Sequence, residues 1–122
     1  MFQVIDMHCD TIPALQWKEK QEHLADADLQ INLDKLEKGG SLCQCFSLFT
    51  FLKGLKDETP FEHVRKLADL WKSEVERYPD RICQIKTYAD LMQVQKEGKI
   101  GAVMTVEEGG VCLLYTSDAA DE

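Results

Sequence analysis

VIDMHCDT, residues 4–11, opens the chain as a short apolar strand that ends in two metal-binding residue types. These are His8 and Asp10, separated by one residue. Because side chains two positions apart in a strand point to the same face, we expect the imidazole and the carboxylate to lie side by side. Such a pair at the end of a buried strand is typical of divalent-metal sites. The stretch therefore predicts the start of the metal site of a hydrolase.

Two further segments have the composition of strands, residues 41–52 and residues 100–106. Both are apolar and almost free of charge, as in strands buried on both faces of a parallel sheet. The first strand is expected at residues 2–8. Helical patterns separate the strands: one begins near Pro13, a short one precedes Gly39-Gly40, a long one runs from Thr59-Pro60 to Tyr78, and one ends at Gly98. This alternation predicts the α/β class, with about three parallel strands joined by crossover helices.

The composition is that of one globular domain, with 122 residues, 44% of them apolar and 30% charged. The net charge of −8 leaves no basic surface for phosphates, so we expect no nucleic-acid partner. No apolar run reaches the roughly 20 residues of a membrane span, and no basic leader precedes the first strand. We therefore expect no transmembrane segment and a cytoplasmic location. The five cysteines, an odd number, indicate reduced thiols.

The last eleven residues, 112–122, depart from this pattern. Their sequence, CLLYTSDAADE, resembles the translation of transposon-adapter DNA used to prepare short-read sequencing libraries. We therefore expect residues 1–111 to be the native part of the domain and residues 112–122 to be a non-native tail. The alternative is a natural acidic C-terminus.

A third candidate ligand follows the last predicted strand, where Glu107 and Glu108 directly precede Gly109-Gly110. Chemistry in parallel α/β folds and barrels sits at the carboxyl ends of the strands. One of these glutamates would therefore lie at the same end of the strands as His8 and Asp10. A carboxylate between two cations can bridge them, and a paired-metal site generates a hydroxide nucleophile at neutral pH.

Three segments carry a family resemblance. Residues 4–13, VIDMHCDTIP, resemble the opening motif of the renal (membrane) dipeptidase family, which are zinc dipeptidases on a (β/α)8 TIM barrel. Residues 39–47, GGSLCQCFS, resemble that family's second-strand segment, and residues 106–110, VEEGG, resemble its bridging-glutamate segment. The resemblance spans about residues 2–110 and keeps the family's order.

The resemblance implies a site for two zinc ions. His8 and Asp10 would bind one zinc, and Glu108 would bridge both. Glu107 is the alternative bridge, because a slip of one residue reverses the face of a strand. The family hydrolyses dipeptides with a metal-bridging hydroxide, so the implied enzyme is a metallodipeptidase whose partner is a dipeptide substrate.

The same resemblance implies that the chain is the N-terminal portion of a truncated barrel. A complete barrel needs roughly 250 residues, and about three of its eight strands are expected in this chain. The family's later metal ligands and substrate-binding residues cannot be placed, so no catalytic residue is assigned. His23 and His63 fall in predicted helices and are not candidates. We expect this truncated chain to be inactive on its own. The full-length parent is expected to be similar to soluble bacterial relatives and could form a homodimer.

Other interpretations of the same residues stay open. Another TIM-barrel metallohydrolase of the amidohydrolase type is one, although those enzymes more often open with His-x-His. In a non-catalytic α/β binding module, His8 and Asp10 would be a structural hydrogen-bonded pair. Asp6, on the face of His8 by strand parity, would support the site or be a structural carboxylate. Cys43 and Cys45 predict buried reduced thiols, because their spacing is shorter than that of zinc pairs.

Overall fold

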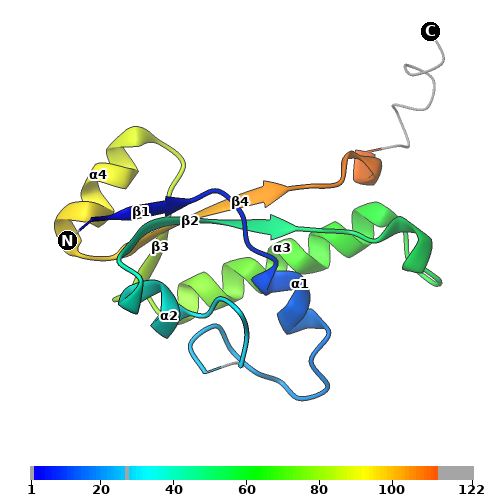
Figure 1. Cartoon of the computed structure of the whole chain (residues 1–122). Coiled ribbons are helices and arrows are strands. Elements are labelled where there is room, and N and C mark those ends of the chain that lie inside the picture. The colour runs from blue at the N-terminus through cyan, green and yellow to red at the C-terminus, as the bar shows by residue number, and fades with distance from the viewer. Residues whose placement is uncertain (1, 27, 113–122) are drawn as a thin grey trace, which may run out of the picture.

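The computed structural model describes residues 2–26 and 28–112. Within these residues, one sheet of four parallel strands has the order β1-β2-β4-β3 (Figure 1). The strands are β1 (Val4–Asp6), β2 (Ser41–Leu48), β3 (Ile82–Gln84) and β4 (Ile100–Val106). The predicted α/β class and parallel sheet are therefore confirmed.

The centre of the sheet is the pair formed by β2 and β4, which are in register from Cys43–Gly101 to Leu48–Val106. Every residue of β2 except Ser41 is buried, as predicted for a strand covered on both faces. The strand is shorter than the predicted 41–52, because the chain leaves the sheet after Leu48 and makes the 3-10 turn η1 (Leu52–Gly54). The carboxyl ends of β2 and β4 therefore lie side by side at one edge.

The prediction of about three strands was short by one, because it missed β3. This strand has three residues and pairs with the first half of β4, from Ile82–Ile100 to Gln84–Ala102. Cys83 is exposed, and only Ile82 is buried. Three residues at a sheet edge give too short a run for an alternating pattern to be visible in the sequence.

An extra residue interrupts the pairing of the N-terminal segment with β2. Asp6 pairs with Gln44. Cys9 then donates its N–H to the Cys45 carbonyl at 3.1 Å and accepts the Ser47 N–H at 2.9 Å, which places it opposite Phe46. Three steps along the first segment thus match two along β2, as in a β-bulge. Because Cys9 faces the core with Phe46, its neighbours His8 and Asp10 are left on the other side.

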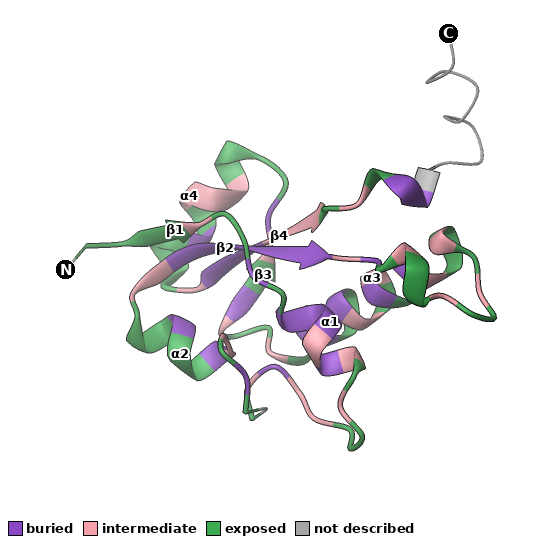
Figure 2. Ribbon diagram, turned by 45° about the vertical axis from the view of Figure 1, so that its right-hand side comes forward, coloured by how far each residue is buried: buried purple, intermediate pink, exposed green. Residues whose placement is uncertain are grey.

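Three helices cover one face of the sheet: α1 (Thr11–Gln16), α2 (Leu33–Lys38) and α3 (Pro60–Arg77). Their apolar side chains form the main core with alternate residues of the central strands, among them Phe46 and Ala102. A smaller core of Cys43, Ile85 and Val94 lies beneath α4 (Tyr88–Glu97). Figure 2 shows that β2 and α1 are largely buried, whereas the surface of α4 is more exposed.

The longest helix begins where the sequence predicts it. Thr59 is the N-cap of α3 and accepts the Glu62 N–H at 3.2 Å, while the Glu62 carboxylate accepts the Thr59 N–H at 2.8 Å. This capping box satisfies donors that a helix start otherwise leaves free. In the described part of the chain, no helix combines the length and the apolar character needed to span a membrane.

Candidate metal centre

Three candidate ligands meet at the carboxyl ends of the strands. His8 lies in the bulged segment after β1, Asp10 is the N-cap of α1, and Glu107 directly follows β4. Nε2 of His8 is 3.2 Å from Oδ1 of Asp10 and 3.7 Å from Oε2 of Glu107. One ligand atom from each residue lies within 4.8 Å of the other two. We call these residues the open cluster, because all three are exposed to solvent.

Ser47 fixes the position of the glutamate. Its hydroxyl donates a hydrogen bond of 2.8 Å to Oε2 of Glu107. Ser47 is fully buried on β2 and pairs in register with Thr105, two residues before Glu107. Because side chains two positions apart share a face of a strand, Glu107 projects to the side on which Ser47 lies. The sequence analysis did not single out Ser47, and the signal that could have found it is a buried hydroxyl on the central strand beside the predicted ligands.

Glu108 is not part of the open cluster. Its Oε1 accepts the Gly110 N–H at 2.8 Å, so its carboxylate folds back onto the turn η2 (Gly109–Cys112). The sequence analysis favoured Glu108 as the bridging residue and kept Glu107 as the alternative. The structure brings Glu107, rather than Glu108, to His8 and Asp10.

The residues around His8 support its loop through the backbone. Oδ1 of Asp6 accepts the His8 N–H at 3.2 Å, so the Asp6 carboxylate contacts His8 through the main chain. Cys9 is buried in the core, and this burial raises the pKa of its thiol. The thiol is therefore held in its protonated form, which is a poor metal ligand. Burial likewise raises the pKa values of Cys43 and Cys45, which are buried free thiols as predicted.

The other two histidines have carboxylate partners of their own. Nδ1 of His23 is 2.8 Å from Oε1 of Glu74, which is almost completely buried in α3. Nδ1 of His63 is 2.8 Å from Oε1 of Glu58. His23 lies in a loop rather than in the predicted helix, whereas His63 lies in α3. Neither is part of the open cluster, in keeping with their exclusion as candidates.

Two hollows flank the open cluster and share Asp10. One, of about 480 Å³, lies between His8, Thr11 and the segment 28–31. The Thr11 hydroxyl donates to the Ile31 carbonyl at 3.0 Å and ties that segment to α1. The other hollow, of about 270 Å³, lies between α1 and the ends of β2 and β4. The cluster is therefore open to molecules from two sides.

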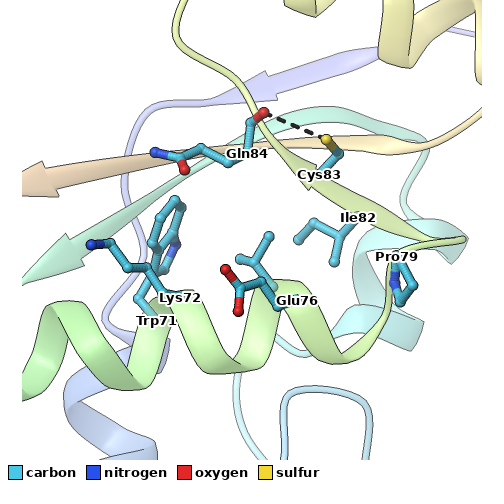
Figure 3. A pocket seen from close by; sticks show the side chains of 8 residues that line it. Trp71, Lys72, Glu76, Pro79, Ile82, Cys83 and Gln84 are labelled. Atoms are coloured by element: carbon cyan, nitrogen blue, oxygen red, sulfur yellow. Dashed lines mark hydrogen bonds between the residues drawn. The ribbon is translucent and has the colours of Figure 1, made fainter.

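A third hollow, of about 250 Å³, lies away from the cluster, between α3 and β3. Figure 3 shows Trp71, Lys72 and Glu76 of α3 facing Ile82 and Gln84 of β3. Its walls are mostly apolar, and it contains no histidine. It runs along the whole edge strand β3, and none of the three residues of the open cluster lines it.

The donor set of the open cluster suits zinc. Zinc prefers imidazole nitrogen and carboxylate oxygen at 2.0–2.2 Å, and catalytic sites use three protein ligands and leave one position open. Ligands on such a tetrahedron are about 3.3 Å apart, and the separations of 3.2 and 3.7 Å from His8 to the two carboxylates bracket that value. The buried hydroxyl of Ser47 and the backbone contact of Asp6 hold these candidate ligands in the way that outer partners do in metal sites.

Comparison with known proteins gives one family. The family model described as membrane dipeptidase (peptidase family M19) matches residues 1–118 of the 122. The match includes residues 112–118, which were predicted to belong to a non-native tail, and residues 113–122 lie outside the described residues. No curated protein matched in the comparison. With its parallel sheet and covering helices, the described part is a partial TIM-barrel-like fold, and the chain belongs to the membrane dipeptidase family.

Proposed function

We propose that the chain supplies His8, Asp10 and Glu107 to the zinc centre of a dipeptidase. Membership of the family indicates dipeptidase-type hydrolysis and a peptide substrate. The observation that carries the metal assignment is the convergence of one imidazole and two carboxylates at the strand ends, with ligand atoms within 4.8 Å of one another. These three residues come from segments separated by about a hundred positions, so the parallel topology brings them together.

Each residue has a distinct part in this proposal. His8 and Asp10, from the segment between β1 and α1, would hold one metal ion, and Glu107, which follows β4, would be the residue shared with a second ion. Zinc bound there would polarise a peptide carbonyl and activate water near neutral pH. Ser47 keeps the Glu107 carboxylate on the side of the cluster, and Asp6 keeps the His8 loop in place.

Zinc titration of the 122-residue chain by calorimetry tests the metal assignment. We expect binding to the wild type and a loss of at least about 100-fold in affinity for His8→Ala, because a removed ligand costs at least as much as a removed outer partner. His63→Ala is the matched control, since His63 pairs with Glu58 outside the cluster. Equal zinc affinity for the wild type and His8→Ala would contradict the proposal.

A further inference from the structure

The smaller hollow beside the open cluster is lined by two carboxylates and three apolar side chains. Asp10 and Glu107 supply the carboxylates, and Pro13, Trp17 and Phe49 supply the apolar walls of a space of about 270 Å³. Two of the three proposed metal ligands therefore also line this hollow. A molecule bound at the cluster would extend directly into it.

The walls come from two elements that also build the cluster. Asp10, Pro13 and Trp17 are spaced by three and four residues along α1 and its caps, so they share one face of the helix. The helix that presents the Asp10 carboxylate thus also presents the indole of Trp17. Phe49 follows directly after β2, the strand that carries Ser47, and faces the same hollow.

The exposure of Trp17 sets it apart from the other tryptophan. Trp17 is 66% exposed, whereas Trp71 is 1% exposed in the core. A single exposed apolar side chain is ordinary, but here it converges with Pro13 and Phe49 on a hollow that contains carboxylates. Apolar walls around a few placed polar groups are typical of sites for small molecules.

We propose that this hollow holds an apolar side chain of the dipeptide whose scissile carbonyl lies at the open cluster. This inference rests on the proposed function and adds the class of substrate. The side chains that flank a scissile carbonyl lie within a few bonds of it, so one of them reaches the adjacent hollow. Leucine-like and phenylalanine-like side chains bury apolar area against Trp17 and Phe49.

Binding of two dipeptides to the zinc-loaded 122-residue chain tests the inference. By calorimetry, we expect Leu-Leu to bind about tenfold more tightly than Gly-Gly, since burying a leucine side chain favours binding by at least this factor. Trp17→Ala is expected to remove most of that difference and to leave Gly-Gly binding within about twofold. Tyr88→Ala is the matched control, because Tyr88 is an exposed aromatic residue on α4, and it should leave both affinities unchanged.

Tryptophan fluorescence gives a second measurement that needs no loss of affinity. Leu-Leu should shield the exposed Trp17 from acrylamide quenching, while Trp17→Ala retains only the buried Trp71 and should show no such protection. Equal affinities for Leu-Leu and Gly-Gly, or an equal loss of both in Trp17→Ala, would overturn the inference while zinc binding stays intact. A wild-type chain that binds no zinc would instead overturn the proposed function, and this inference with it.

Discussion

The chain contains two histidine–carboxylate groups that have similar chemistry and opposite surroundings. In the open cluster, the side chains of His8, Asp10 and Glu107 are 50%, 65% and 46% exposed, respectively. The side chain of Glu74 is only 2% exposed. Its two oxygens accept from His23 at 2.8 Å and from the Leu24 N–H at 2.7 Å. We call this second group the closed pair.

The two groups differ in how accessible their carboxylate oxygens are to a bound ligand. In the closed pair, the hydrogen bonds tie the loop before α2 to α3 and occupy both oxygens of the buried carboxylate. In the open cluster, Asp10 and Glu107 keep oxygens that face solvent and two hollows. We therefore expect burial and the position at the strand ends, rather than residue types alone, to separate a structural pair from the proposed metal site.

The largest expected effect is on the closed pair. Glu74→Ala leaves the buried Leu24 N–H without its acceptor and His23 without its partner, so we expect a loss of about 3 kcal/mol in the free energy of unfolding. Glu76→Ala, an exposed position on the same helix, should change it by less than about 0.5 kcal/mol. Urea unfolding measures the free energy of unfolding of both variants. Similar losses for Glu74→Ala and Glu76→Ala would contradict a structural role for the closed pair.

The next effect separates the two neighbouring glutamates. Glu107→Gln should weaken zinc binding by about 30-fold, because a neutral amide replaces a charged ligand. Glu108→Gln should stay within about threefold, since Glu108 contacts the Gly110 backbone instead of the cluster. Calorimetric zinc titration of both variants compares them directly. A larger loss for Glu108→Gln would favour the original assignment of the bridge to Glu108.

The smallest effect concerns a buried group on the central strand. Burial raises the pKa of the Cys43 thiol above its ordinary value of 9.0. Stability from the protonated thiol is complete below the ordinary value and is lost as pH rises through the folded value. At pH 10, the wild type should have lost up to about 1.4 kcal/mol more than Cys43→Ala. Urea unfolding at pH 7 and pH 10 measures this loss of unfolding free energy. Cys83→Ala, at an exposed position, is the control, and we expect it to show the same loss as the wild type.

The sequence could predict the parts of the fold that depend on local patterns. Apolar runs and the Thr59–Glu62 capping box located the central strands and the start of α3. The i, i+2 spacing correctly suggested that His8 and Asp10 lie side by side. Strict strand alternation was not the reason, because an extra residue precedes Cys9 and Asp10 already caps α1. Such a bulge depends on pairing with β2, which no local pattern reveals.

Other parts depend on contacts between distant residues. The doubled glutamate left two registers open, and the pairing of Ser47 with Thr105 determines which glutamate faces the cluster. The buried role of Glu74 depends on a loop fifty residues earlier in the chain, at Leu24. The edge strand β3 depends on an existing neighbour, β4, to form its hydrogen bonds. Each of these features arises from tertiary pairing, so the sequence pattern alone did not contain it.

Diffraction from zinc-soaked crystals of the chain, with anomalous data at the zinc edge, tests the central claim most directly. We predict an anomalous peak about 2.0–2.2 Å from Nε2 of His8 and from carboxylate oxygens of Asp10 and Glu107. The closed pair of His23 and Glu74 should carry no peak. A zinc peak at Glu108 without Glu107, or at the closed pair in place of the open cluster, would contradict the account.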